Sequence, residues 1–299
     1  MIIGDNKARV IDNIKKAIEN GEYNKKVEVG DPSLTAKEQE EIIKKYMAKQ
    51  EKLGYKINSK IANVILSAAT DMQNKETEFV GIENIKDITG GAIITSNHFN
   101  PLDNTIIQKL ARDMGKKRLY IVGQVTNLAM DGFIGFMMNH SNIIPISRQV
   151  SYMKKEFAKT IKNKLKENNY ILIYPEEEMW FNYRKPRNLK LGAYYYAAKN
   201  NVPIISCFVE MRDTNEVDNF EFYKVKHVLH ILPPIYPDSG KTAKENSVIM
   251  MQKDYEQKKQ AYEKAYNKKL DYGFEIDDIA GWIQNNEELE KTISLVDIK

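Results

Sequence analysis

Short apolar runs alternate with longer amphipathic stretches between residues 77 and 232. The runs are rich in isoleucine and valine and apolar at successive positions, a pattern typical of strands buried on both faces of a parallel sheet. The stretches between them have helical spacing. We predict strands at 91–96, 119–123, 142–146, 170–174, 203–209 and 226–232, and helices at 103–115, 127–139, 151–168 and 188–200. This alternation predicts an α/β fold with a mixed, largely parallel sheet flanked by helices.

Helical patterns also flank this central region. The stretch 36–74 reads as a helical hairpin, with arms at about 36–53 and 57–74 and a break at Gly54-Tyr55. Its second arm carries an apolar face that either packs on the domain or lies on a membrane, and packing is the favoured interpretation. A charged helix runs from 241 to about 269. We divide the chain into an N-terminal helical region (1–75), a central α/β domain (76–240) and a C-terminal helical extension (241–299).

Composition narrows the class of protein. The 299 residues are 42% hydrophobic and 29% charged with a net charge of +4, which is ordinary for a globular protein and too weakly basic to indicate nucleic-acid binding. The single cysteine, Cys207, excludes an internal disulfide. The first residues lack the pattern of a signal peptide, and no apolar run is long enough to span a bilayer. We expect a cytoplasmic protein whose contact with a membrane is peripheral.

His98 and Asp103 lie where the strand at 91–96 gives way to a helix. A neutral imidazole can take a proton from a hydroxyl near pH 7, and a carboxylate on its other nitrogen fixes the tautomer and stabilises the imidazolium. The same spacing also suits a capped helix start, with Asn100 as N-cap, Pro101 as the first helical residue and Asp103 in the first turn. Taken alone, the two residues leave both interpretations open.

Further blocks follow in an informative order. An apolar, glycine-containing segment leads into a strand that is followed by Arg148, and the next strand ends in Tyr174-Pro175-Glu176. Lys190 then precedes Gly192-Ala193, and Val202-Pro203-Ile204 opens another strand. All are expected at one edge of the sheet, where open α/β folds place their ligand sites. Together with the His-x4-Asp block they resemble the glycerolipid acyltransferase family over about residues 90–210. The family includes glycerol-3-phosphate and 1-acylglycerol-3-phosphate acyltransferases.

The resemblance implies a function and a set of site residues. It implies transfer of a fatty acyl group from acyl-CoA or acyl-carrier protein to a hydroxyl of a glycerophosphate- or lysophospholipid-like acceptor at a membrane surface, in phospholipid biosynthesis. His98 and Asp103 would be catalytic, and the substrate-binding residues would be Arg148, Tyr174, Pro175, Glu176 and Lys190. Neither a metal nor a cofactor beyond the acyl thioester is expected. The enzyme would work at the inner face of the membrane. Backbone N–H groups at the following helix start could donate to the oxyanion, although the sequence does not locate the donor.

One segment departs from the family. After the aromatic-Pro-Glu block the family usually has Gly-Thr-Arg, which helps to hold the acceptor phosphate, whereas this chain has Glu177-Glu178-Met179. Either the loop turns these acids away or the acceptor lacks a phosphate, and the basic group at 184, 185, 187 and 190 either replaces the phosphate ligands or forms a solvated loop. Two other functions stay open: an acyl-thioester or ester hydrolase, and a lipid-binding protein that has lost activity.

Overall fold

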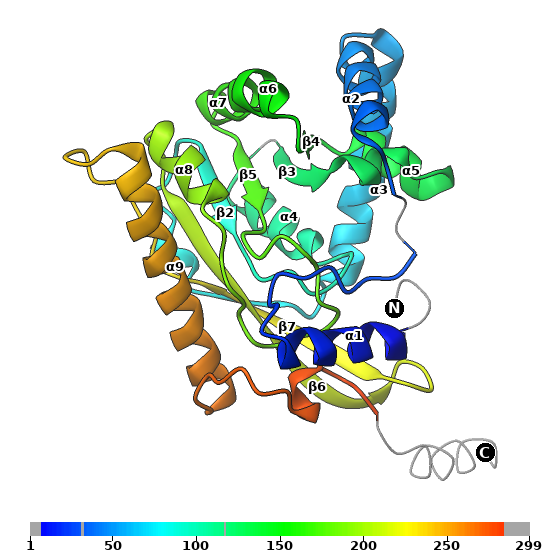
Figure 1. Ribbon diagram of the computed structural model, residues 1–299, viewed down its shortest axis with the longest axis vertical. Coiled ribbons are helices and arrows are strands. Elements are labelled where there is room, and N and C mark those ends of the chain that lie inside the picture. The colour runs from blue at the N-terminus through cyan, green and yellow to red at the C-terminus, as the bar shows by residue number, and fades with distance from the viewer. Residues whose placement is uncertain (1–6, 31–32, 117, 284–299) are drawn as a thin grey trace.

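A seven-stranded sheet forms the centre of the computed structural model, which describes residues 7–30, 33–116 and 118–283 (Figure 1). The strand order is β1-β7-β6-β2-β5-β3-β4, and all neighbours are parallel except the antiparallel pair β6 and β7. The strands are β1 (Glu78–Val80), β2 (Ala92–Thr95), β3 (Leu119–Gln124), β4 (Ile143–Ile146), β5 (Tyr170–Ile173), β6 (Ile204–Val217) and β7 (Tyr223–Ile231). The predicted fold class, a mixed and largely parallel sheet flanked by helices, is confirmed.

The two central strands show why apolar runs become strands here. Every residue of β2 is buried, and in the register with β5 Ile93 lies beside Ile171 and Ile94 beside Leu172. Both faces of the sheet are covered, so an unbroken apolar sequence is stable in extended form. Burying each such side chain contributes roughly 1.5–3 kcal/mol. The chain leaves this packed centre at the carboxyl end of β2, directly before His98.

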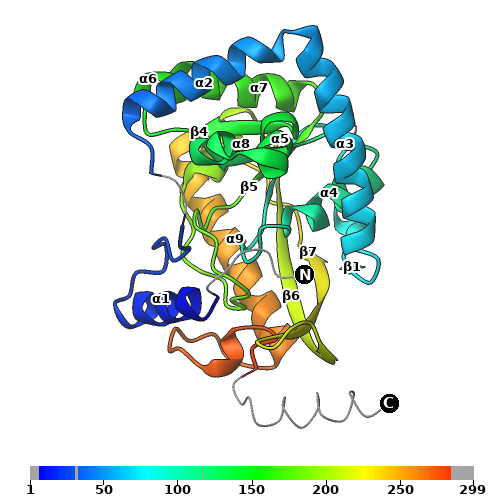
Figure 2. The same cartoon turned by 90° about the vertical axis from the view of Figure 1, so that its right-hand side faces the viewer.

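Helices cover both faces of the sheet (Figures 1 and 2). Ile106 and Leu110 of α4 pack on one face, and Ile161 of α7 and Tyr194 of α8 pack on the other. The α-helices are α1 (Lys7–Glu19), α2 (Ala36–Gln50), α3 (Leu53–Gln73), α4 (Asn104–Asp113), α5 (Gly132–His140), α6 (Val150–Tyr152), α7 (Ala158–Lys166), α8 (Gly192–Lys199) and α9 (Ala243–Tyr266). The long helix α9 lies along the molecule beside β6, where Tyr262 contacts Phe208 (Figure 2).

The predicted helical hairpin is present as α2 and α3, and a Thr35–Glu38 capping box starts its first arm. The break lies at residues 51–52, so Gly54 and Tyr55 are inside the first turn of α3 instead of between the arms. Of the residues of α3, only Ser59, Ala62 and Thr70 are buried, so the expected packing of this arm is only partial. Across the described ranges, no helix combines the length and the apolar content needed to cross a bilayer.

Several predicted boundaries were wrong. The helix expected at 103–115 begins at Asn104, the helix expected at 127–139 is a 3-10 turn followed by α5, and the helix expected at 151–168 begins before Ser151 and contains a π-helical stretch before α7. The pattern missed β1, which is a short edge strand, and α1. It also ended β6 too early, because the polar second half of β6 is stabilised by its antiparallel pairing with β7.

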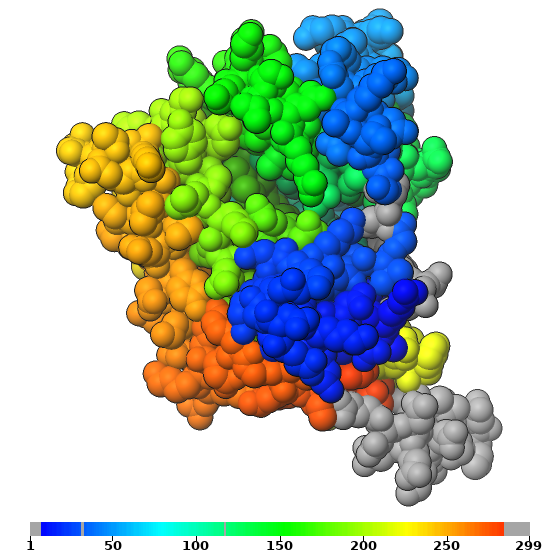
Figure 3. Space-filling view, in the orientation of Figure 1, coloured from blue at the N-terminus to red at the C-terminus, as the bar shows by residue number. Residues whose placement is uncertain are grey.

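A separate cluster joins segments from four parts of the chain. Val10, Ile14 and Ile18 of α1 pack against Trp180 and Phe181, which follow β5. The other members are Ile11, Ala17, Val27, Tyr183, Phe222 and Ile279. In the space-filling view the N-terminal residues, in dark blue, lie directly against the orange-red C-terminal residues (Figure 3). The loop after β5 therefore runs between the sheet and the N-terminal segment.

Candidate active site

His98 and Asp103 form a hydrogen-bonded pair at the carboxyl end of β2. The Nδ1 atom of His98 lies 2.8 Å from Oδ2 of Asp103. The same oxygen accepts the backbone N–H groups of Phe99 at 2.9 Å and Asn100 at 3.2 Å. The carboxylate thus closes a tight turn around residues 99–103. The predicted cap is present, since the side chain of Asn100 accepts the N–H of Leu102 at 3.0 Å and Asp103 accepts the N–H of Asn100, but residues 101–103 form a turn and α4 begins only at Asn104.

Tyr174 completes this pair from the end of β5. Its hydroxyl donates to Oδ1 of Asp103 at 2.6 Å, and its ring stacks on the imidazole of His98 with the centroids 3.9 Å apart. Burial and the neighbouring carboxylate raise the pKa of Tyr174 well above its ordinary value, so the hydroxyl stays protonated and remains a donor. The Asp103 side chain is 2% exposed and the His98 side chain 22% exposed. Nδ1 is engaged, so the free Nε2 is the nitrogen available to a substrate.

Glu176, which the sequence places among the substrate-binding residues, is buried against Arg187. Its Oε2 accepts from a guanidinium nitrogen at 2.8 Å and from the backbone N–H of His98 at 3.3 Å, and its Oε1 accepts the backbone N–H of Arg187 at 2.9 Å. Both side chains are at most 2% exposed. The carboxylate therefore supports the backbone of the loop that carries His98, and these hydrogen bonds are all made within the protein. Pro175, which lies between Tyr174 and Glu176 in the sequence, is also buried.

The basic group expected after β5 is mostly internal. Lys185 forms an ion pair with Asp278 at 2.9 Å, and Arg184 pairs with Asp213. Arg187 pairs with Glu176, as described above. All three basic residues are buried. Neither alternative drawn from the sequence holds for them, because they are neither solvated nor free for a phosphate.

Arg148 and Lys190 differ from that group. Arg148 follows the end of β4 and Lys190 precedes α8, and both are exposed. The backbone N–H of Lys190 donates to the carbonyl of Pro175 at 2.8 Å, which ties the residue to the loop after β5. Neither side chain forms an ion pair within the described part of the chain. Both are therefore available to an anionic group of a substrate.

The Glu177-Glu178-Met179 segment forms a turn at the edge of the sheet. Glu177 has a left-handed backbone with a φ of 67° and is exposed. An Oε1 atom of Glu178 accepts from the side chain of Gln124, the last residue of β3, at 3.1 Å. One extra carboxylate thus points to solvent and the other stays at the edge where the strands end.

The backbone N–H groups next to the histidine are engaged within the loop. Those of Phe99 and Asn100 donate to Asp103, that of Leu102 donates to the side chain of Asn100, and that of Asp103 donates to the carbonyl of Asn100. The expectation that this helix start supplies oxyanion donors does not hold for these four groups.

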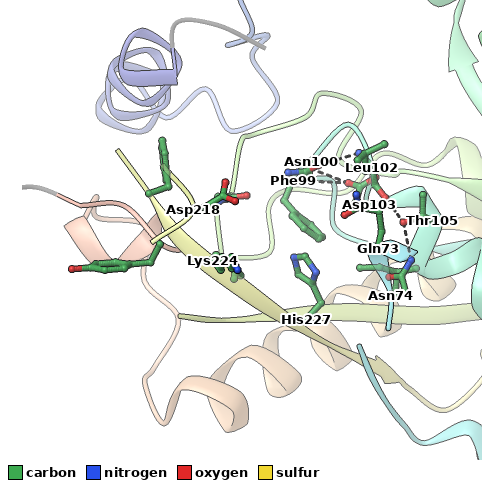
Figure 4. A pocket seen from close by; sticks show the side chains of 15 residues that line it. Gln73, Asn74, Phe99, Asn100, Leu102, Asp103, Thr105, Asp218, Lys224 and His227 are labelled. Atoms are coloured by element: carbon green, nitrogen blue, oxygen red, sulfur yellow. Dashed lines mark hydrogen bonds between the residues drawn. The ribbon is translucent and has the colours of Figure 1, made fainter. Parts of the chain in front are cut away.

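A polar cavity of about 230 Å³ lies beside Asp103, between the 99–106 segment, the end of α3 and β7 (Figure 4). Its lining includes Asn100, Lys224 and His227 but not His98. The ring of His227 lies against Phe99, with centroids 5.4 Å apart. Burial lowers the pKa of His227 to about 4, so its ring is neutral at pH 7.

Sequence reasoning brought together five of the seven site residues. His98, Asp103 and Tyr174 contact one another, Glu176 bonds the His98 backbone, and Pro175 lies between the last two. It missed the role of Arg187, because nothing in the local sequence separates an arginine that pairs with a buried glutamate from one in a solvated loop.

Known acyltransferases share sequence features with this part of the chain. The profile of the acyltransferase family matches residues 76–210, the region that holds the His98–Asp103 pair and the loop after β5. A comparison with curated proteins gives no match. Among solved structures the chain is similar to the 1-acyl-sn-glycerophosphate (LPA) acyltransferase PlsC from Thermotoga maritima, with 16% sequence identity, a TM-score of 0.48, and coverage of 88% of this chain and 100% of that one. Residues 76–210 of the chain, which form this site, are therefore similar to the acyltransferase family.

Proposed function

We propose that this acyltransferase moves a fatty acyl group from an acyl thioester, of coenzyme A or of acyl-carrier protein, to a hydroxyl of a glycerophosphate- or lysophospholipid-like acceptor. The observation that carries the proposal is the fixed imidazole. Asp103 holds Nδ1 of His98 at 2.8 Å and is itself fixed by Phe99 and Tyr174. The free Nε2 is then presented as a base to a hydroxyl.

The reaction runs as a single displacement in this proposal. Nε2 of His98 takes the proton from the acceptor hydroxyl while the oxygen attacks the thioester carbonyl. The tetrahedral oxyanion collapses, the carbon–sulfur bond breaks, and the leaving thiolate takes the proton from the imidazolium. Asp103 stabilises the imidazolium between these two steps. The chemistry as written needs no cofactor besides the thioester.

Acceptor recognition draws on the exposed cations at the site edge. Arg148 and Lys190 are the sequence-predicted basic residues that have no ion pair within the described ranges, so they are the candidates for an acceptor phosphate. Glu178 opposes this role, because a carboxylate close to a phosphate repels it by about 1 kcal/mol or more even at high dielectric. The pairing of Glu178 with Gln124 keeps the carboxylate engaged at the end of β3.

A labelled acyl thioester, tested with and without a lysophospholipid acceptor, checks the proposed reaction. Acceptor-dependent formation of acylated lipid is expected, and His98→Ala should lower its rate by about 10²–10⁴. His140→Ala is the matched control, because His140 lies in α5 and its Nδ1 bonds the carbonyl of Phe136. Release of free fatty acid at an equal rate without acceptor would support a hydrolase instead. A wild-type protein that binds lipid without turnover would support an inactive lipid-binding protein.

A membrane surface is the proposed partner of α3, at the inner, cytoplasmic face. Large apolar side chains are exposed along one row of this helix, at Leu53, Ile57, Ile61, Val64 and Met72, with exposed fractions from 48% to 75%. Lysines at 52, 56 and 60 run beside the row and are also exposed. Phe133 and Ile134 of the neighbouring α5 are exposed as well. An apolar row edged by lysines suits an anionic bilayer, with the apolar groups at the acyl boundary and the cations at the headgroups.

Sedimentation with vesicles tests this surface. Val64→Glu should weaken binding to vesicles that contain anionic lipid, because it places a charge within the apolar row. Phe220→Glu is the control, because it makes the same change of charge at a residue that is 69% exposed in the turn between β6 and β7, away from α3. Equal binding by both variants and the wild-type protein would refute a docking role for α3.

A further inference from the structure

The backbone of His98 is held on both sides by one buried ion pair. Its N–H donates to Glu176 at 3.3 Å, and its carbonyl accepts from Arg187 at 3.5 Å and from the backbone N–H of Trp180 at 3.0 Å. The guanidinium of Arg187 also lies over the Trp180 ring, 4.6 Å from its centroid. The residue that carries the imidazole therefore has its main chain fixed by groups from the loop after β5.

That loop is in turn fixed by the N-terminal segment. The side-chain amide of Asn24 donates to the carbonyls of Glu176 at 3.0 Å and Asn188 at 2.7 Å, at the two ends of the loop. The carbonyl of Tyr23 accepts from Arg187 at 3.1 Å, and that of Lys25 accepts from the indole of Trp180 at 2.9 Å. Residues 23–25 thus bind the start, the middle and the end of the loop.

The packing of α1 holds these three residues in place. Val10, Ile14 and Ile18 are buried against Trp180 and Phe181, so α1 and the loop form one cluster. The side chain of Asn13 in α1 donates to the carbonyl of Val27 at 3.0 Å, which folds the segment back on itself. In Figure 1 the segment after α1 passes in front of the green loop that follows β5.

From these contacts we infer that Asn24 and Arg187 are positioning residues for the acyl transfer, and that the N-terminal segment 7–30 braces the catalytic histidine. The acyltransferase profile begins at residue 76, so the brace lies outside the matched region. The contacts run from Asn24 to the ends of the loop, through the Glu176–Arg187 pair, to the main chain of His98. Neither positioning residue touches the imidazole itself. The inference rests on the proposed function, in which His98 is the base.

The physical reason is the narrow tolerance of proton transfer. Nε2 has to meet the acceptor hydroxyl within hydrogen-bond distance while Nδ1 keeps its bond to Asp103. Loosening the loop shifts the His98 main chain and spreads the imidazole over several positions. A misplacement of about 1 Å costs about 10²-fold in rate. Substrate binding depends on other groups and changes less.

Asn24→Ala is the first variant, because it removes two hydrogen bonds without leaving a buried charge. We expect kcat to fall about 10-fold to 100-fold with KM changed less than about twofold. Asn84→Ala is the matched control: it removes one side-chain hydrogen bond to a backbone carbonyl, that of Ile231 at 2.8 Å, and lies outside both the segment 7–30 and the loop after β5. It should keep the wild-type kcat. Equal kcat values for the two variants would overturn the inference, even if both melt at a lower temperature.

Two further measurements separate positioning from folding and from the proposed function. Arg187→Lys keeps the charge beside Glu176 but cannot reach Tyr23 and His98 together, so a folded variant should also lose kcat. The chain has four histidines, so the imidazole signal of His98 can be assigned by NMR with a His98→Gln variant. That signal should shift or broaden in Asn24→Ala and stay unchanged in Asn84→Ala. An inactive wild-type protein would refute the proposed function, and the NMR comparison would still decide the brace, since an unshifted signal in Asn24→Ala overturns it.

Discussion

Replacement of Asp103 by asparagine tests the central pair of the site with little change in shape. The carboxylate accepts four hydrogen bonds, from His98, Phe99, Asn100 and Tyr174. The amide oxygen of asparagine can still accept the two backbone N–H groups, and the Tyr174 hydroxyl can turn to accept from the new NH₂ group. The turn should therefore persist, while the negative charge beside the imidazole is lost.

The loss can be worked out from the geometry. With Nδ1 and Oδ2 at 2.8 Å, the imidazolium and carboxylate charge centres are about 4 Å apart and attract by about 4 kcal/mol at an effective dielectric near 20. This attraction is present only after the proton has moved to His98. Because each 1.36 kcal/mol corresponds to a factor of ten, Asp103→Asn should lower kcat about 10³-fold, with KM nearly unchanged.

The assay is release of free thiol from an acyl thioester in the presence of a lysophospholipid, confirmed by the acylated lipid product. Asp113→Asn serves as the control, since Asp113 pairs with Lys109 at the surface end of α4 and should keep wild-type activity. If Asp103→Asn retained more than a tenth of the wild-type kcat while His98→Ala was inactive, the assigned role of Asp103 would be refuted.

Three further predictions concern groups outside the acyl-transfer step. Lys258→Met should destabilise the fold by about 3–5 kcal/mol in urea unfolding, because it leaves the fully buried Asp254 carboxylate without its cationic partner. Lys253→Met, at an exposed position of the same helix, should change the free energy of unfolding by less than about 0.5 kcal/mol. The Cys207 thiol should resist iodoacetamide at pH 8 in the native protein and react after unfolding, because burial raises its pKa to about 12; modification of the native protein at the rate of a free thiol would contradict this. Burial lowers the pKa of His227 from 6.5 to about 4. Between these two pH values the unfolded chain binds a proton on this residue and the native chain does not. The free energy of unfolding therefore falls as the pH drops from 6.5 towards 4, by at most about 3 kcal/mol. His227→Phe should reduce this acid sensitivity, and an unchanged pH dependence of unfolding would refute the assignment.

The central sheet could be predicted because its signal is local. An unbroken apolar run such as Ala92–Thr95 is stable as a strand only where both faces are covered, so the run itself indicates its surroundings. The short strand β1 and helix α1 gave no such signal. The burial of α1 depends on Trp180 and Phe181, more than 150 positions away, and no local pattern encodes that contact.

The same distinction explains which exposed and buried charges were misjudged. Arg184, Lys185 and Arg187 form a basic run typical of a solvated or phosphate-binding loop. Lys185 and Arg184 are instead buried beside Asp278 and Asp213 from other parts of the fold, and Arg187 is buried beside Glu176 at the start of the same loop. Conversely, the apolar arm of the hairpin was expected to pack, and much of its apolar surface is exposed on α3.

By itself the sequence determined the α/β class, the order of the blocks at the carboxyl ends of the strands, and the His98–Asp103 pair, because five residues in one tight turn can adopt few geometries. Only the tertiary structure decided that Tyr174 fixes Asp103, that the Glu176–Arg187 pair bonds both sides of the His98 backbone, and that Asn24 holds both ends of the loop after β5. Apart from the Glu176–Arg187 pair, which is 11 positions apart, these contacts join residues 71 to 164 positions apart. These contacts are stabilised by burial and charge pairing that exist only once the chain has folded. The spacing of residues along the sequence therefore does not indicate which residues will meet.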